Sequence, residues 1–320
     1  MSFETRRLTS DFGIEVIGLD LERPLGEAVR ERLFQTWIDG GILLVRGVRS
    51  MDAHLRFSRY FGTPEQAAVP DNVMPENPLI MLLTYDPDSP KSATMPLYEV
   101  DGEARAGYLG WHWDQSFMPV IVRGAAMRMI RTARSGGRTG FIDAVATYDR
   151  LPQPLKDRIE GLEVVYQLTA DQENNRFGFP ESLKVARPRP NAEAKIAQLQ
   201  RDFPPVVHPL VITQAETGRK VLKLSPMHAK YVLGLDARES DALLTELANH
   251  MVDERHAYFH EWRDDDLIIW DNWRMIHCTT GVPLDCDRLA HRTTIIGDYG
   301  EGRYLDPALS GSQPTAHMVD

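Results

Sequence analysis

The sequence has few cysteines and no long apolar run, and both absences narrow the class of protein it encodes. Only Cys278 and Cys286 occur in 320 residues, too few for a scaffold held together by disulfides. The longest apolar stretches, 42–45 and 79–83, are far shorter than the roughly 20 residues that cross a bilayer. Residues 1–16 also lack the apolar core of a signal peptide. We therefore expect a soluble, cytoplasmic protein with no membrane partner.

Positive charge is also scarce. The chain has 36 Lys and Arg against 46 Asp and Glu, a formal net charge of −10, and no basic run long enough to form a tail. Proteins that bind nucleic acids neutralise phosphates with a surplus of basic side chains. We therefore expect no nucleic-acid partner and look for a small-molecule substrate instead.

Two segments carry clear helical signals. A helix is predicted over 27–39, where Gly40 and Gly41 end it. Asp236 is a plausible N-cap for a later helix, on which Leu243, Leu247 and Met251 recur at steps of four residues.

Most other apolar segments are short enough to be strands. In the last third of the chain we predict strands over 267–270, 275–278 and 293–296. Many short strands with few helices favour a β core with helices packed outside it over a repeating βαβ order. The length fits one large domain over 1–320.

Two segments lack regular periodicity. Residues 86–110 are rich in Pro, Gly, Ser and Asp, so we expect a mobile loop there that serves as a lid near a site. Residues 171–205 are rich in Pro, Arg, Asn and Gln, and we expect a surface insertion with one helix over 192–201.

The segment GWHWDQSF carries a candidate metal pair. If Trp111 to Asp114 is extended, the two-residue period places His112 and Asp114 on one face and Trp111 and Trp113 on the other. Imidazole and carboxylate, completed by a distant histidine, form the facial triad that holds Fe(II) and leaves positions open. The spacing alone is weak evidence for a metal site and favours a hydrogen-bonded pair at a strand edge.

A third ligand has to come from the nine other histidines. His277 is the best placed, because within 264–278 it follows a strand and a polar turn and opens the next strand. Isolated histidines are usually structural. We assign the following histidines to the core or the surface: His208, His228, His250, His256 and His260.

Five segments resemble, in order, the successive blocks of the TauD/TfdA family of Fe(II)- and 2-oxoglutarate-dependent dioxygenases. These segments are WHWDQSF, SGGRTGFIDAVATYDRLP, HPLVITQAETGRKVLKLS, DDDLIIWDNWRMIHCTTG and HRTTIIGD. The segments IEVIGLDLERPL, ILLVRG and FSRYFGTPE extend the resemblance to about residues 10 to 300. The resemblance implies an α+β, mainly β fold: a double-stranded β-helix (jelly-roll, cupin-like) core with flanking helices.

The resemblance also implies roles for individual residues. His112, Asp114 and His277 would hold the iron, and 2-oxoglutarate and O2 would occupy the remaining positions. Arg292 would clamp the distal carboxylate of 2-oxoglutarate, since a guanidinium meets a carboxylate through two hydrogen bonds. Thr139 would add a hydrogen bond to the same carboxylate.

Alternative roles stay open for these residues. Arg288 could be the clamp in place of Arg292, or share that role. Thr139 could be a plain turn residue, and the neighbouring Gly136 and Gly137 could suggest a phosphate cradle, although no lysine accompanies them.

The implied reaction is the hydroxylation or oxidative cleavage of a small organic acid, an aryl or alkyl carboxylate or sulfonate, with release of succinate and CO2. Taurine-specific relatives have a histidine shortly after the Phe-Gly block, but residues 61–70 contain none here, so we do not expect taurine. A second anion anchor is not obvious; Arg105, Arg176 and Arg303 are candidates.

Two other functions remain open on the same residues. One is a non-catalytic β-barrel protein that binds a small molecule. The other is a zinc-dependent hydrolase that uses the same His/Asp/His set, because zinc accepts these ligands with an open position. Relatives commonly self-associate, so the resemblance also implies a homo-oligomer.

Overall fold

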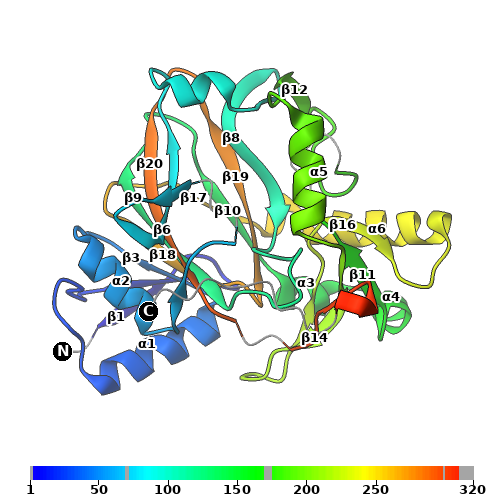
Figure 1. The fold of residues 1–320 in the computed structure, drawn as a ribbon. Helices are drawn as coiled ribbons and strands as arrows, with labels where there is room; N and C mark the ends of the chain where they lie inside the picture. The colour runs from blue at the N-terminus through cyan, green and yellow to red at the C-terminus, as the bar shows by residue number, and fades with distance from the viewer. Residues whose placement is uncertain (1–2, 69–71, 169–174, 298–299, 310–320) are drawn as a thin grey trace.

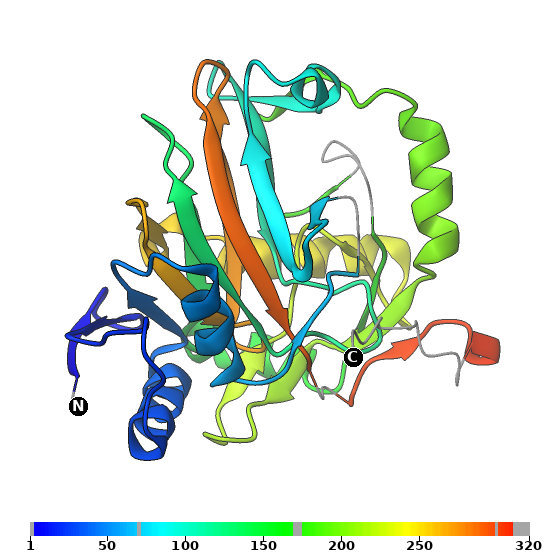
Figure 2. The same cartoon turned by 60° about the vertical axis from the view of Figure 1, so that its left-hand side comes forward.

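Two β-sheets face each other in the centre of the molecule (Figures 1 and 2). This computed structural model describes residues 3–68, 72–168, 175–297 and 300–309. Within these residues six α-helices lie around the sheets, so the architecture is mixed α/β. None of the helices described is long and apolar enough to span a bilayer.

The larger sheet has nine strands, paired antiparallel except between β2 and β3. Its strands in spatial order are β1 (Glu4–Arg7), β2 (Ile14–Ile17), β3 (Ile42–Val45), β18 (Leu267–Asp271), β9 (Gly124–Arg131), β20 (Arg288–Ile295), β6 (Asn77–Tyr85) and β5 (Val73–Met74), with β4 (Pro64–Glu65) paired to β20. The facing sheet has six antiparallel strands: β12 (Lys184–Arg187), β7 (Leu97–Val100), β8 (Glu103–His112), β19 (Met275–Pro283), β10 (Thr139–Asp143) and β17 (Tyr258–His260).

Two smaller sheets complete the described strands. One has the order β16 (Ala229–Val232), β11 (Glu163–Tyr166), β13 (Val206–Pro209) and β21 (Arg303–Tyr304). The other pairs β14 (Val211–Thr213) with β15 (Lys220–Leu222).

The central strands of the nine-stranded sheet are buried on both faces. In β3, Ile42 and Leu44 pack with Phe141 of the six-stranded sheet. Leu43 and Val45 point the opposite way, toward helices. This two-sided burial explains why the strand reads as an unbroken apolar run instead of an alternating pattern. The space between the sheets is therefore a second core, and its open end holds the candidate site.

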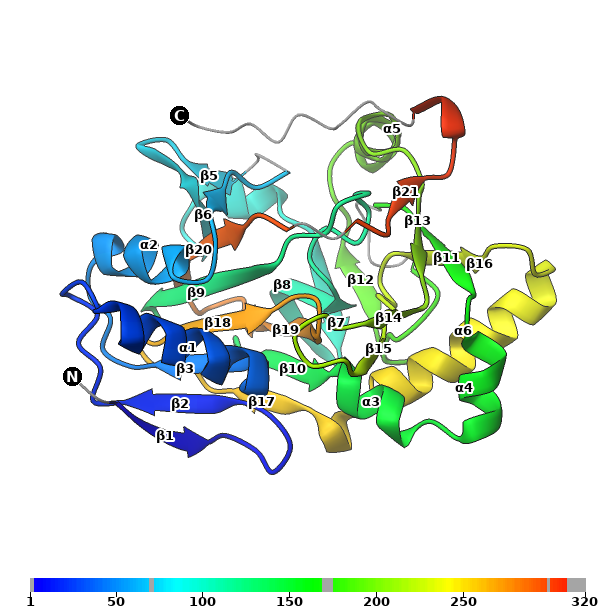
Figure 3. The same ribbon diagram turned by 90° about the horizontal axis from the view of Figure 1, so that it is seen from below.

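The helices cover the outer surfaces of this arrangement (Figure 3). They are α1 (Glu27–Gly40), α2 (Met51–Arg59), α3 (Ala144–Arg150), α4 (Gln153–Ile159), α5 (Ala192–Asp202) and α6 (Ala237–Met251). Helices α1 and α2 pack on the outer face of the nine-stranded sheet. Helices α3, α4 and α6 pack with the four-stranded sheet in a separate apolar cluster.

Both helices with clear sequence signals are confirmed. Helix α1 is one residue longer than predicted. Helix α6 begins after Asp236, whose carboxylate accepts a hydrogen bond from the Glu239 backbone N–H at 2.9 Å. Leu243, Leu247 and Met251 on its inner face are fully buried. The sequence alone was sufficient to predict these two helices because the signals of each one lie within or directly beside the helix itself.

The prediction of an irregular loop over 86–110 is wrong for most of that segment. It contains a short 3-10 helix, η2 (Pro90–Thr94), and the strands β7 and most of β8. Strand β8 pairs on one edge with β7, through a turn at Asp101 and Gly102, and on the other edge with β19, which lies far away in the sequence and leaves no local signal. The role of this segment as a lid stays a prediction.

Part of the predicted surface insertion, 171–174, lies outside the described residues. The remainder contains β12 and α5, and α5 ends one residue after the predicted helix. Leu199 is the only buried residue of α5, which agrees with a surface position. The assignment of a single domain to residues 1–320 stays a prediction.

A buried arginine ties three elements to the start of β19. Two nitrogens of Arg274 donate to both carboxylate oxygens of Asp143, at 3.0 and 2.7 Å, and a third donates to the carbonyls of Ile38 and Asp39. Asp143 also caps α3 by accepting from the Val145 backbone N–H. Both charged side chains are almost fully buried, so neither can be solvated if its partner is lost.

We expect Arg274→Met to lower the free energy of unfolding by about 3–5 kcal/mol, because it leaves the Asp143 carboxylate buried and unpaired. Arg219→Met removes an exposed pair with Asp149 and should cost within about 1 kcal/mol. Urea denaturation followed by circular dichroism measures both. Equal losses in the two variants would contradict this role of Arg274.

Candidate active site

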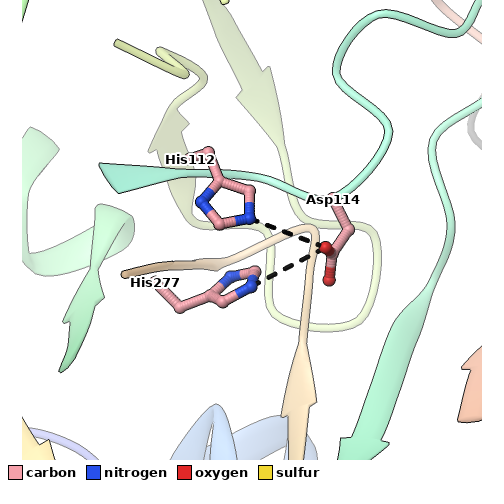
Figure 4. A group of neighbouring side chains, drawn as sticks. All are labelled: His112, Asp114 and His277. Atoms are coloured by element: carbon pink, nitrogen blue, oxygen red, sulfur yellow. Dashed lines mark ion pairs between the residues drawn. The ribbon is translucent and has the colours of Figure 1, made fainter. Parts of the chain in front are cut away.

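The pairing of β8 with β19 brings two histidines of the candidate site together. In this antiparallel ladder His277 lies directly opposite His112, and their ring centroids are 4.2 Å apart. Both rings are buried, with 6% and 8% of their residues' surfaces exposed. Two residues that are distant in sequence thus become neighbours through the sheet register (Figure 4).

Asp114 completes the group from the turn that follows β8. The prediction of an extended chain is correct up to His112, but Asp114 already belongs to a turn. Its Oδ1 nevertheless lies 3.8 Å from Nε2 of His112 and 3.7 Å from Nε2 of His277. The three ligand atoms lie within 4.8 Å of one another, and no other such group occurs among the described residues.

The electrostatics of the group suit metal binding. Burial lowers the pKa of His112 and of His277, so both rings are neutral near pH 7. Nδ1 of His112 donates to the Gly110 carbonyl at 2.8 Å, which leaves the Nε2 lone pair facing Asp114. Two neutral imidazoles and one carboxylate form a donor set that fits a divalent metal.

The carboxylate of Asp114 also pairs with Arg292. One guanidinium nitrogen of Arg292 lies 2.6 Å from Oδ2 of Asp114. Burial of Asp114 opposes its ionisation, but Arg292 and the two histidines outweigh that effect and lower its pKa to about 2. The carboxylate is therefore charged at neutral pH and available as a ligand.

A fully buried asparagine holds the backbone of Asp114 in place. Oδ1 of Asn272 accepts from the Asp114 backbone N–H at 2.9 Å. The side-chain NH2 of Asn272 donates to the carbonyls of Asp114 and Val122, at 3.0 and 3.1 Å. Ser225 supports the same turn by accepting from the Trp113 backbone N–H at 3.1 Å. Asn272 thus orients Asp114 by binding the Asp114 backbone on both sides with its own side chain.

The two tryptophans of GWHWDQSF point away from the group, as predicted. Trp111 and Trp113 both pack in the apolar cluster with α3, α4 and α6. Of the histidines assigned to structural roles, His208, His228 and His260 are buried. His228 contacts the ring of His112, with centroids 6.2 Å apart, and its Nδ1 pairs with the Ser116 hydroxyl.

A cavity of about 640 Å³ opens beside the metal group. Its size lies within the range of small-molecule sites in proteins. His112, His277, Thr139, Arg288 and Arg292 all line it, so it joins the candidate ligands to the candidate cosubstrate residues.

Arg288 and Arg292 line the same cavity because they lie four residues apart on β20. Side chains of a strand alternate, so both point to the face that carries Ala290, toward the six-stranded sheet. The opposite face of β20, which carries Thr293, packs against α2. There the Thr293 hydroxyl lies 2.7 Å from the hydroxyl of Ser58.

The two arginines differ in their partners. Arg292 pairs with Asp114. Arg288 is half-buried and has no carboxylate partner among the described residues; its Nε is shielded from solvent without a hydrogen bond, and desolvation lowers its pKa to about 10. A shielded guanidinium nitrogen without a partner is costly, which favours an anion beside Arg288.

Thr139 lies at the start of β10 and is not free of contacts. Its hydroxyl oxygen accepts from the Trp262 indole N–H at 3.0 Å. The hydroxyl hydrogen therefore remains free to donate into the cavity that Thr139 lines.

The three candidate second anchors do not line this cavity. Arg105 pairs with Glu103, Arg176 with Asp241 and Arg303 with Glu163. The sequence analysis missed two basic residues that do line it, Lys91 and Arg189. Both lie in segments without periodicity, so no local pattern distinguished them from other surface charges.

The chain is similar to known proteins over most of its length. A family model described as "Taurine catabolism dioxygenase TauD, TfdA family" matches residues 4–294. The chain is 30% identical to an alpha-ketoglutarate-dependent 2,4-dichlorophenoxyacetate dioxygenase of Cupriavidus pinatubonensis, covering 93% of this chain and 99% of that protein. It is 29% identical to an (S)-phenoxypropionate/alpha-ketoglutarate-dioxygenase of Sphingobium herbicidovorans, covering 93% and 96%.

A solved structure has the same fold. A putative alpha-ketoglutarate-dependent taurine dioxygenase from Burkholderia xenovorans superposes with a TM-score of 0.73 at 21% identity. The superposition covers 95% of this chain and 98% of that one. At this identity the likeness concerns the fold alone.

The role of Asn272 can be tested through metal affinity. We expect Asn272→Asp to weaken Mn(II) binding by about 10- to 100-fold, because the new carboxylate cannot donate to the carbonyls of Asp114 and Val122. Calorimetric titration of the metal-free protein measures the affinity, and the melting temperature reports on folding. Asn77→Asp is the matched control. The Asn77 side chain accepts a hydrogen bond from the Leu79 backbone N–H within β6, and Asn77 does not line the cavity. An unchanged affinity in Asn272→Asp would contradict the role.

Proposed function

The chain belongs to the TauD/TfdA family of 2-oxoglutarate-dependent dioxygenases, and on this premise we propose that it uses Fe(II) and O2 to hydroxylate or oxidatively cleave a small organic acid, with release of succinate and CO2. The observation that carries the proposal is the buried group of His112, Asp114 and His277 at one end of an arginine-lined cavity.

In this proposal His112, Asp114 and His277 hold the metal. Their donor set is the facial triad, which leaves three positions for other ligands. Bound Fe(II) would supply the redox chemistry that activates O2. The residues of the chain fix the geometry: Gly110 sets the tautomer of His112, and Asn272 holds the turn that carries Asp114.

We propose that Arg288 and Thr139 hold the distal carboxylate of 2-oxoglutarate. The resemblance had assigned this carboxylate to Arg292, with Arg288 as the alternative. Four residues of β-strand span about 13 Å, so Arg288 starts much farther from the metal group than Arg292 does. Arg288 has no carboxylate partner among the described residues, whereas Arg292 is engaged with Asp114.

Arg292 then has a different task in the same site. Because it lies against Asp114, it is placed to meet a carboxylate close to the metal, on either the cosubstrate or the primary substrate. Its guanidinium carbon lies 5.4 Å from the ring centroid of Trp270, which supports the side chain from one face.

The wall of the cavity favours an aryl or alkyl acid as the primary substrate. Met81, Leu83, Met95, Pro96 and Tyr98 contribute apolar surface, while the arginines supply positive charge. The relatives named above act on phenoxypropionate and 2,4-dichlorophenoxyacetate, which are acids with an apolar body. Taurine has no such body, and the absence of a histidine in 61–70 still speaks against it.

We also propose that the segment 86–110 covers the site. Residues from η2, β7 and β8 line the cavity, among them Ser89, Ser92 and Tyr108. A wall of this kind would exclude water from the reacting atoms.

Several broader expectations remain proposals. The two facing antiparallel sheets support a double-stranded β-helix core. The thiols of Cys278 and Cys286 are unpaired, in line with a cytoplasmic location. A homo-oligomer would be detected by light scattering during gel filtration.

The two alternatives are not supported. The matched family and the named relatives are oxygenases, which favours neither a non-catalytic binding protein nor a zinc hydrolase.

The direct test measures succinate formed from 2-oxoglutarate with a panel of aryl and alkyl carboxylates and sulfonates. We expect Fe(II)-dependent succinate release above the background seen without an acid, and its loss to below about 1% in His112→Ala and Asp114→Ala, since each removes a metal ligand. Zn(II) should not replace Fe(II). Full activity in both variants would exclude the metal assignment.

The clamp is tested by a pair of matched variants, Arg288→Lys and Arg292→Lys. We expect Arg288→Lys to raise the KM for 2-oxoglutarate at least tenfold, because an ammonium loses the bidentate contact. Arg292→Lys should change the KM for 2-oxoglutarate less than Arg288→Lys does. The reverse order would return the clamp to Arg292.

A further inference from the structure

Two more cations line the cavity, at a part of its wall that follows the end of β6 where Tyr85 pairs with Arg288; we call this end the rim. Arg189 and Lys91 line this end, together with the side chains of Ser89 and Asn72. Lys91 donates to the Asn72 side-chain oxygen at 3.1 Å. Neither cation has a carboxylate partner among the described residues, unlike Arg105, Arg176 and Arg303 on the outer surface.

The rim is assembled by contacts that fix the position of Arg189. Two residues earlier, Arg187 donates to the carbonyls of Ser92 and Met95, at 2.6 and 3.0 Å. These bonds fasten the segment after β12 to η2, which carries Lys91. The two cations therefore come from elements that are tied together, although about a hundred residues separate them in sequence.

The Nε of Arg189 lacks a hydrogen bond. This atom is shielded from solvent and has no partner in the described part of the chain. Shielded polar groups in proteins are nearly always paired, so an unpaired one at the wall of a cavity points to a ligand.

The charge of the cavity leads to the same conclusion. Four cations line it, Lys91, Arg189, Arg288 and Arg292, against Asp86 and the adjacent Asp114. The charges of a divalent metal and of 2-oxoglutarate cancel each other. Two positive charges then remain, and the two cations of the rim have no anion assigned to them.

We propose that the rim of Arg189 and Lys91 is a second anion subsite, and that the primary substrate is an elongated acid with a second anionic group. This inference rests on the proposed function. One acidic group lies near Arg292 and the metal, the apolar body lies along Met81, Leu83 and Met95, and the second acidic group meets the rim. The subsite favours those aryl and alkyl acids that carry an anionic group at the end opposite the carboxylate near Arg292.

The test compares three acids of nearly equal shape: phenoxyacetate, 4-carboxyphenoxyacetate and the uncharged amide 4-carbamoylphenoxyacetate. For the wild-type protein we expect kcat/KM to be at least about fivefold higher for the diacid than for the amide at low salt. The ratio should fall in 0.5 M NaCl, because a partly exposed ion pair is screened. In Arg189→Met the ratio should fall to about one.

Three further measurements test whether the preference arises at the rim. Arg176→Met removes an exposed arginine outside the cavity and should keep the wild-type ratio. Calorimetric titration of the metal-free protein with the diacid and the amide reports binding without turnover and should show the same preference. A longer diacid, 4-(carboxymethyl)phenoxyacetate, tests the spacing between the two anionic ends.

The outcomes separate this inference from the proposed function. Equal turnover of the diacid and the amide, or a preference unaffected in Arg189→Met, overturns the subsite while the dioxygenase proposal stands. If none of the acids increases succinate release, the proposed substrate class fails, and the subsite fails with it.

Discussion

The pairing of β8 with β19 is the interaction on which the rest of the site depends. It sets His112 opposite His277, and a slip of one residue in this register would turn one histidine to the opposite face of the sheet. The turn after β8 adds Asp114, and the turn before β19 adds Asn272, which binds the backbone of Asp114. One strand pair and its two adjoining turns therefore hold every part of the metal group, while Arg274 ties the start of β19 to α1 and α3.

The sequence predicted structural features whose signals lie close together in the chain better than those that depend on residues far apart. The signals of α1 and α6 are local: they predicted the bounds of α1 to within one residue and the N-cap of α6 at Asp236. Within 86–110, β7 and β8 form a hairpin with its turn at Asp101 and Gly102, a local signal that the sequence analysis did not use, whereas β19, the other partner of β8, lies far away in the chain. The start of β20 was placed five residues late, because Arg288 and Arg292 break its apolar pattern. A strand that lines a polar cavity loses the alternation by which strands are recognised.

The residues of the candidate site also differ in how far the sequence could identify them. The spacing of His112 and Asp114 indicated a pair of ligands, and the position of His277 at the start of a strand made it the best third candidate. The family resemblance supplied the role of Thr139 and the choice between two arginines. That choice depended on which guanidinium was already engaged, and only the fold could show that Arg292 contacts Asp114. The sequence did not identify Arg189 and Lys91 as residues that line the cavity, for a related reason. A charge in an irregular segment looks the same in sequence whether it faces water or a cavity.

The pairing of β8 with β19 also governs the order in which the protein can acquire its metal during synthesis. His277 follows His112 by 165 residues, so at about 5–20 residues per second a ribosome needs roughly 8–33 s to make the second histidine after the first. During that interval the growing chain contains His112 and Asp114 but not β19, the strand that carries His277. On the proposed function, an iron ion would therefore find all three ligands only after His277 has been made and β19 has paired with β8.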